Sequence, residues 1–128
     1  MICKNYKDVE PVKVGKGVMV RWLTHKDLGG DKYLHNHALR MFTIAPKSEV
    51  GIHNHEFTQI VYILSGNLIF SVLSHDGTRK DRKVGPGDYV YTYSYEHHGI
   101  RNPSDSTPVH LLCCIDCVGD KENCVPTR

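Results

Sequence analysis

Histidine is the residue type in this chain whose spacing most clearly suggests chemistry. Nine of the 128 residues are histidines, and two of them, His53 and His55, are separated by a single residue. An extended strand would place both imidazoles on one face, ~6.7 Å apart along it. Two imidazoles so arranged can bind one transition-metal ion. The pair alone is weak evidence, because surface or hydrogen-bonded histidines show the same pattern.

Gln59 lies an even number of residues after both histidines, so on a regular strand its side chain would share their face. A straight strand would carry it ~13 Å beyond His55. It can join a site with the two histidines only if residues 56–58 turn the chain. The polar break between two strand-like segments permits that turn.

The segments around these residues have the character of short strands. Runs rich in β-branched and aromatic residues predict strands at 18–23, 39–44, 60–64, 68–73, 89–93 and 109–115. Gly66-Asn67 predicts a hairpin between the third and fourth of them. Asp76-Gly77 predicts a second hairpin, since a type I′ turn needs positive φ at both central residues. Residues 85–88 predict a third turn. Helix signals are nearly absent, so the sequence predicts an all-β sandwich or barrel.

Two groups of residues then resemble the two sequence motifs of the cupin family. The first group is Gly51, His53, His55, Gln59 and Gly66, and the second is Gly87, His98 and Asn102. Shorter matches are similar to small one-domain cupins: Arg21-Trp22, Leu39-Arg40, Pro86-Gly87-Asp88, Arg101-Asn102 and Leu111-Leu112-Cys113. The resemblance covers roughly residues 17–119.

The resemblance implies a fold, a site and an assembly. The expected fold is a cupin jelly-roll barrel (a double-stranded β-helix) in one domain over residues 1–128, with its core at about 17–119 and peripheral terminal segments. The barrel strands would bring His98 beside the first pair. The implied metal ligands are His53, His55, Gln59 and His98. Small cupin barrels commonly pair, and an exposed sheet edge benefits from cover, so a homodimer is expected.

This sequence departs from the family pattern at the fourth ligand position. Gln59 stands where glutamate, or histidine in some small cupins, is usual. Three neutral imidazoles and an amide leave the +2 charge of a divalent ion uncancelled, which favours an anionic or chelating small-molecule ligand. Gln59 also has an alternative role, as a hydrogen-bond partner of a metal-bound water. Imidazole and oxygen ligands suit Fe, Mn, Ni, Zn or Cu, and the sequence does not choose among these cofactors.

The second motif and other histidines leave further alternatives. Tyr93 and Tyr95 replace the usual proline and glycine, and His97 directly precedes His98. We select His98 because Asn102 then falls at the motif's spacing. His35 and His37 form a second pair, interpreted as polar residues between a loop and a strand.

Three residues are candidates for a substrate pocket: His37 at the barrel mouth, Tyr93 near His98, and Cys113 inside the barrel. Tyrosines 89, 91, 93 and 95 share one face, which is more typical of packing than of chemistry. The alternation of Leu111, Cys113, Ile115 and Cys117 favours core packing over a zinc or redox site.

Composition argues against nucleic-acid binding and a membrane span, and it bears on location and on the state of the cysteines. A formal charge of +2 gives no basic excess that would indicate nucleic acid. No apolar run approaches the ~20 residues of a membrane span. The first residues lack a signal-like apolar region, so a cytoplasmic location is expected. Five cysteines in such a chain are expected to be reduced.

The resulting functional hypothesis is a metal-dependent cupin enzyme acting on a small oxygen-rich molecule, with dioxygenase chemistry favoured. Lyase, isomerase or cyclase chemistry by a Lewis-acid metal is an alternative. A non-catalytic cupin that binds a metal or small molecule is another, because Gln59 cannot act as a base. A purely structural barrel is the least favoured.

Overall fold

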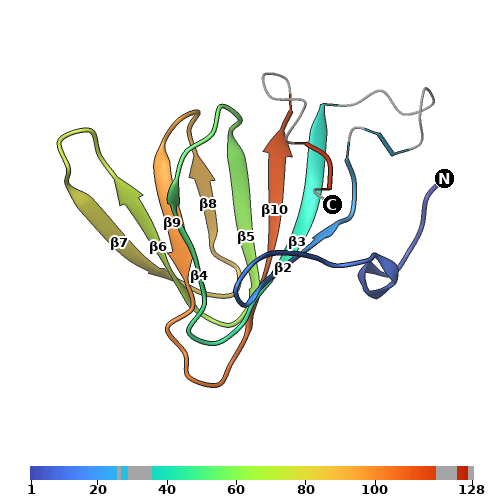
Figure 1. Cartoon of the computed structure of the whole chain (residues 1–128), viewed down its shortest axis with the longest axis horizontal. Coiled ribbons are helices and arrows are strands. Elements are labelled where there is room, and N and C mark those ends of the chain that lie inside the picture. The colour runs from blue at the N-terminus through green and yellow to red at the C-terminus, as the bar shows by residue number, and fades with distance from the viewer. Residues whose placement is uncertain (26, 29–35, 118–123, 127–128) are drawn as a thin grey trace.

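A computed structural model describes residues 1–25, 27–28, 36–117 and 124–126 of the chain (Figure 1). The second histidine pair therefore falls partly outside the described residues, since His35 is not among them. Within these ranges one 3-10 helix precedes ten strands. They are η1 (Tyr6–Asp8), β1 (Val12–Gly15), β2 (Val18–Trp22), β3 (His37–Ile44), β4 (Glu49–His53), β5 (Gln59–Ser65), β6 (Leu68–Leu73), β7 (Arg79–Val84), β8 (Tyr89–Thr92), β9 (His97–Arg101) and β10 (Val109–Asp116).

The strands form two antiparallel sheets. The larger has the order β1-β2-β3-β10-β5-β8, and the smaller has the order β4-β9-β6-β7. In Figure 1, β7, β6 and β9 lie to the left, and β10, β3 and β2 lie to the right. Consecutive strands therefore alternate between sheets over much of the chain, as in a jelly roll. The predicted all-β class is confirmed.

One predicted hairpin is wrong in its pairing. The turn at Gly66 joins β5 to β6, but these strands belong to different sheets and do not pair with each other. Gly66 has φ +80°, and an added Cβ would lie 2.7 Å from the carbonyl oxygen of Pro108. The backbone that connects the two sheets therefore passes close to Pro108. The hairpin at Asp76-Gly77 is confirmed, since β6 pairs with β7 in continuous register.

The core follows from strict alternation along the central strands. In β10 the inward residues Val109, Leu111, Cys113 and Ile115 are buried, and in β5 the inward residues Gln59, Val61 and Ile63 are buried. Residues of period two share one face of a strand, so each strand lends one face to the interior. The predicted inward direction of Cys113 is confirmed.

Asn102, which sets the spacing of the second motif, has a structural role. Its side chain is 1% exposed. The amide nitrogen donates hydrogen bonds to the carbonyl oxygens of Ile44, Ala45 and Thr107 at 3.1, 3.3 and 2.8 Å. Its Oδ1 accepts one from Ser104 N at 3.1 Å. Asn102 thus joins the end of β3 to the loop before β10.

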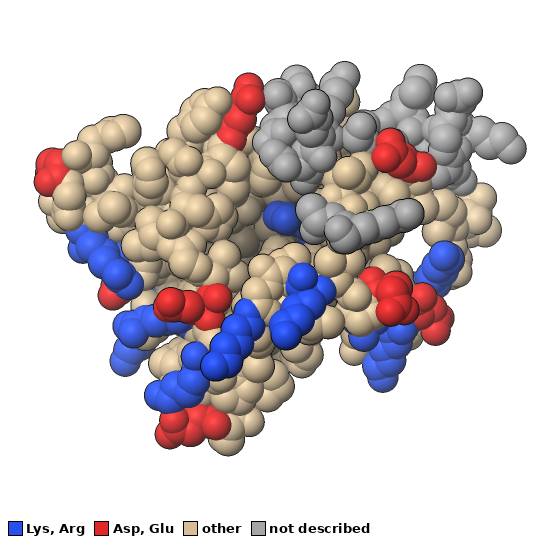
Figure 2. Space-filling view, in the orientation of Figure 1, with Lys and Arg blue, Asp and Glu red and all other residues tan. Residues whose placement is uncertain are grey.

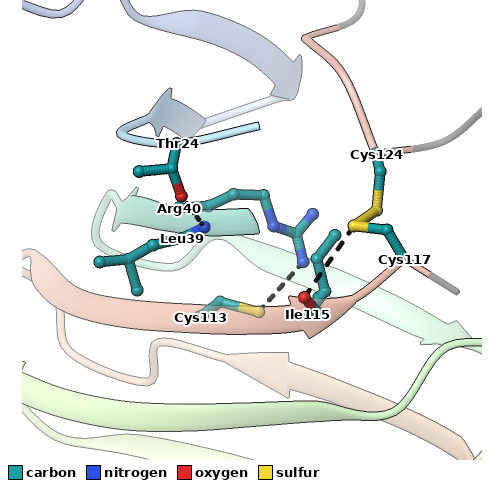
Figure 3. Close-up of a disulfide and its surroundings, with 7 residues drawn as sticks. All are labelled: Thr24, Leu39, Arg40, Cys113, Ile115, Cys117 and Cys124. Carbon is teal, nitrogen blue, oxygen red and sulfur yellow. Dashed lines mark hydrogen bonds between the residues drawn. A yellow bond between two sulfur atoms is a disulfide. The ribbon is translucent and has the colours of Figure 1, made fainter. Parts of the chain in front are cut away.

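The expectation that all five cysteines are reduced is wrong for two of them. Cys117 and Cys124 form a disulfide, shown in Figure 3. Cys124 returns to within 5.8 Å of Cys117, measured between Cα atoms, a separation that a disulfide can bridge. Cys3, Cys113 and Cys114 are free. Cys117 is buried, in agreement with its predicted core position.

The surface carries both signs of charge. In the face shown in Figure 2, basic and acidic side chains are interspersed, and a hollow near the centre holds a recessed basic side chain. Within the described part of the chain, no helix has the length and apolar character needed to cross a membrane.

Candidate metal centre and cavity

The sequence motifs converge at the point where β4 meets β9. His53, the last residue of β4, lies opposite His98 of β9 in the strand register. Gly99 makes this contact possible, because a Cβ there would lie 2.9 Å from Val50 O and 3.0 Å from Ile52 N. A larger residue beside His98 would push the two strands apart.

His55 and Gln59 reach the same point because the chain leaves the strand. β4 ends at His53, residues 56 and 57 form a bend, and β5 begins at Gln59. The turn required for Gln59 to face the histidines is therefore present. Gln59 is 8% exposed, and its side-chain nitrogen lies 3.0 Å from Nε2 of His98.

The three histidines are oriented in the same way, by the backbone. Nδ1 of His53 lies 2.8 Å from Gly51 O, Nδ1 of His55 lies 2.7 Å from Phe57 O, and Nδ1 of His98 lies 2.7 Å from Glu96 O. Carbonyl oxygens only accept, so each Nδ1 carries the proton and each Nε2 keeps its lone pair. Histidine ligands of metals are typically held by such a bond from the second ring nitrogen.

The distances fit a single ion. One ring nitrogen from each of His53, His55 and His98 lies within 4.8 Å of the others. The ring centroids are 5.4, 4.7 and 4.8 Å apart for the three pairs. The cupin resemblance implies a metal, and these three histidines could hold one. The structure brings His98, which is 2% exposed, into this group in preference to His97.

The surroundings lower the pKa of two of these imidazoles, His55 and His98. The pKa of His55 is lowered to about 4, mainly by burial, with smaller electrostatic contributions from His98, His53 and Arg40. Burial is also the main cause of a lowered pKa at His98. Neutral imidazole is the form that binds metals, so protons compete little for the ring nitrogens of His55 and His98.

A cavity of about 300 Å³ opens beside the histidines. Its lining is largely apolar and includes Val50, Phe57, Val61, Phe70, Ile100 and Leu111. We call His53, His55, His98 and Gln59 the histidine wall. We call Trp22, Arg40, Phe42 and Cys113 the arginine wall. Among the described lining residues there is no aspartate or glutamate.

The two walls are joined by a chain of hydrogen bonds. Arg40 Nη2 donates to Cys113 Sγ at 3.0 Å, as Figure 3 shows. The Cys113 thiol donates to Gln59 Oε1 at 3.5 Å, and the Gln59 amide nitrogen donates to Nε2 of His98. Cys113, a member of the arginine wall, thus also bonds to the histidine wall, and it lines the cavity.

The structure does not bring the other two predicted pocket residues into this cavity. Thr92 is the inward-facing residue at the end of β8, so the adjacent Tyr93 faces outward and is 65% exposed. Tyr93 packs edge-on against Tyr91, with centroids 5.4 Å apart. His37 is exposed at the start of β3 and lines a separate hollow with Tyr91 and Cys114.

The arginine wall was not predicted from the sequence as a functional feature. Arg21-Trp22 and Leu39-Arg40 contributed only to the family resemblance. The available signal was the strand alternation, since β2 and β3 pair with Trp22 opposite Arg40. That register indicates contact between the two side chains but not that they border a cavity.

Comparison with known proteins relates this geometry to a family. The family described as the cupin domain matches residues 40–115, more than half of the chain. Among curated proteins no match is found.

Solved structures are similar over nearly the whole chain. One is the polyketide cyclase RemF from Streptomyces resistomycificus, with a TM-score of 0.77 and 24% identity over 91% of this chain and 80% of that one. Another is an RmlC-like cupin from Shewanella frigidimarina, with a TM-score of 0.72 and 19% identity over 95% and 94%. A third is a variant of oxalate decarboxylase from Bacillus subtilis, with a TM-score of 0.73 and 22% identity over 93% of this chain and 30% of that one. Identities this low show a shared fold.

Proposed function

Because the chain belongs to the cupin family, we propose that it is a metal-dependent enzyme acting on a small oxygen-rich molecule. The observation that carries the proposal is the orientation of His53, His55 and His98. Each ring has Nδ1 bonded to a carbonyl oxygen, so three Nε2 lone pairs remain for one divalent ion at the cavity. Such an ion, when bound, supplies a Lewis acid or a site for oxygen chemistry.

Gln59 is proposed as the fourth group of the centre. In the structure its amide nitrogen donates to His98 Nε2, the lone pair that an ion would use. Rotation of the amide by half a turn would direct Oε1 to the ion and the nitrogen toward Cys113. Gln59 would then ligate directly or hold a water. Either way it adds no negative charge, so the centre favours an anionic or chelating ligand.

Oxygenase chemistry, and within it a dioxygenase, is the favoured reaction. Among the described residues lining the cavity, none is a carboxylate that could act as a general base. Reactions that begin with proton abstraction by the protein are therefore less well supported than reactions in which O₂ is a second substrate. The same feature supports a second candidate, a cupin that binds its ligand without turnover.

The first test is the metal content of protein purified without chelators. We expect about one divalent ion per chain, drawn from Fe, Mn, Ni, Zn or Cu, and its loss in a His53→Ala, His98→Ala variant. Wild-type protein that holds no ion, even after anaerobic incubation with each metal, would overturn the proposal. Circular dichroism of both proteins checks that the fold is retained.

The second test separates the reaction classes. Catechol, a 1,3-diketone and a 2-hydroxy acid serve as chelating probes for the metal-loaded protein in an oxygen electrode. Oxygen consumption that the double variant lacks supports an oxygenase. Product formed under argon supports a lyase or isomerase. Tight binding without product in either atmosphere supports the binding protein.

A homodimer is proposed through the outer face of β5 and β8. Ile60, Tyr62, Leu64, Tyr89 and Tyr91 are each more than 40% exposed there, and neither strand carries a charged residue. β8 is an edge of the larger sheet, whereas β7, an edge of the smaller sheet, carries four basic residues that discourage pairing. A second copy of the chain fits, since a neutral aromatic surface is compatible with itself.

Light scattering should give a dimer that Tyr62→Lys dissociates and Tyr6→Lys does not, and a monomeric wild type would contradict this.

The proposed location is the cytoplasm. The Cys117–Cys124 disulfide is an observation against it, because disulfides are rare in cytosolic proteins. Thiol titration of protein extracted from cells under alkylating conditions would measure whether this bond exists in its native compartment.

A further inference from the structure

Arg40 is a positively charged side chain on a cavity wall that is otherwise mostly apolar. It lies on β3, and the cavity that its side chain lines is also bordered by the three histidines. Among the described residues, no carboxylate is paired with it. A guanidinium without a carboxylate partner in an apolar site is costly unless something anionic occupies that site.

The guanidinium is held in a fixed position by two aromatic rings. Its central carbon lies 5.2 Å from the ring centroid of Trp22 and 5.0 Å from that of Phe42. Stacking of this kind suits the planar guanidinium and restricts its rotation. The hydrogen bond from Nη2 to Cys113 Sγ restrains rotation of the guanidinium in its own plane. The group is therefore pre-oriented before any ligand arrives.

Two donors of this wall lack acceptors. Arg40 Nε and Trp22 Nε1 are both buried and have no hydrogen-bond partner among the described residues. Buried polar groups in proteins nearly always have a partner. Both are donors, so the missing partner is an acceptor. The free N–H of Arg40 Nε and the positive charge of the guanidinium therefore both favour a ligand that is an anionic hydrogen-bond acceptor.

Arg40 also lies close enough to the histidine wall to share one ligand with it. Arg40 and the three histidines line the same cavity. The hydrogen-bond chain through Cys113 and Gln59 connects Arg40 to His98 with two intervening side chains. The cavity of about 300 Å³ between them is lined mainly by apolar groups.

From these observations we infer that Arg40, in contact with the rings of Trp22 and Phe42, is a carboxylate-binding subsite facing the three-histidine centre. The ligand class is a small carboxylate with a flat apolar body. Its carboxylate binds the guanidinium, its body contacts the apolar lining, and its oxygen at the other end faces the histidines. The inference rests on the proposed function only for that last contact. The carboxylate subsite itself is independent of a metal.

Trp22 provides the readout, because it is the chain's single tryptophan and is in contact with Arg40. Benzoate and its neutral isostere benzamide are titrated into chelator-treated protein at about pH 8, where imidazoles are neutral, with Trp22 fluorescence followed. We expect benzoate to bind about tenfold or more tighter than benzamide, the usual contribution of a charge-assisted hydrogen bond.

Three variants test the assignment. Arg40→Met should abolish the preference for benzoate over benzamide. Arg40→Lys should retain part of it, because lysine keeps the charge but not the planar fork. Arg82→Met removes an exposed arginine of β7 and should leave the preference unchanged. The preference is a ratio within one protein, so a partial loss of folded protein does not imitate the effect.

The metal content of the same proteins separates this inference from the proposed function. Arg40→Met should keep the wild-type metal content, and the His53→Ala, His98→Ala variant should lose the metal but keep the benzoate preference. Wild-type protein that binds both probes equally, or an Arg40→Met variant with an unchanged preference, would overturn the subsite. A benzoate preference that depends on Arg40 in a protein that holds no metal would support the subsite and reject the metal centre.

Discussion

The two walls of the cavity are built in different ways. The histidine wall uses residues near the ends of β4, β5 and β9, with each imidazole oriented by a carbonyl oxygen two residues away. The arginine wall uses residues of β2, β3 and β10, with Arg40 oriented by side chains of neighbouring strands. Local backbone thus positions one wall, and tertiary packing positions the other.

Their charges differ for the same reason. Burial lowers the pKa of His55 and His98, which favours the neutral form of both imidazoles. Arg40 remains charged, because a guanidinium does not lose its proton in proteins. A neutral wall suited to a cation therefore faces a cationic wall suited to an anion. This difference predicts that the two walls can be disabled separately.

Removal of two histidines should have the largest effect. In the His53→Ala, His98→Ala variant, metal content should fall from about one ion per chain to near none, since one imidazole does not hold a structural ion. Elemental analysis measures this directly. His97→Ala, which changes the neighbour outside the cluster, is the control and should keep the metal. Loss of metal in the control would mean that the second motif is displaced by one residue.

The next largest effect is expected from Gln59→Glu. A carboxylate next to the ion should strengthen metal binding by about tenfold or more and weaken benzoate binding to the metal-loaded protein by a similar factor. Metal competition with a chelator and Trp22 fluorescence measure the two quantities. Gln59→Leu should weaken metal binding and should not weaken benzoate binding, because leucine adds no negative charge. Equal behaviour of the two variants would show that Gln59 does not face the ion.

The sequence predicted the histidine wall because its information is local. Two short motifs contain all four residues, and the cupin resemblance links them. Two structural conditions remained, the bend at residues 56–57 and the pairing that places His98 opposite His53. Of the arginine wall, Cys113 was predicted as a pocket residue, but Trp22 and Arg40 were missed, because nothing in the sequence spacing indicates that these side chains meet Cys113. That contact depends on the register of β2, β3 and β10.

The fold also separates into features that local sequence predicted and features that depend on contacts between distant segments. The strands rich in β-branched and aromatic residues were predicted. β4 is extended by its pairing with β9, and β9 by its pairing with both β4 and β6. The predicted pairing across Gly66 failed, since a turn does not reveal whether it joins strands of one sheet or of two. The Cys117–Cys124 disulfide was also missed, because it depends on where the chain goes after β10.

An intermediate effect is expected from pH, and only at the histidine wall. The pKa of folded His55 is about 4, below its ordinary 6.5, so the unfolded chain binds more protons between these values. Stability of the metal-free protein should be complete above about pH 6.5 and fall by on the order of 2 kcal/mol toward pH 4, with allowance for partial exposure.

Urea unfolding at several pH values measures this loss. His55→Gln should remove a large share of it, because glutamine does not titrate. Arg40→Met should reduce it slightly, since Arg40 is the smallest of the causes that lower the pKa. If wild type and His55→Gln lose stability in parallel, the imidazole is not the group responsible.

The smallest effect is expected at Cys113, the residue of the arginine wall that also bonds to the histidine wall. Cys113→Ala removes the acceptor of Arg40 Nη2 and the donor to Gln59 Oε1. Stability should fall by about 1 kcal/mol, the usual contribution of such bonds. The benzoate preference should fall about two- to threefold, because Arg40 keeps its aromatic contacts but loses one restraint. Cys114→Ala, one residue away on the outer face of β10, is the matched control and should leave the preference unchanged. If both variants behave alike, the walls act independently, and the chain of hydrogen bonds between them has no part in ligand binding.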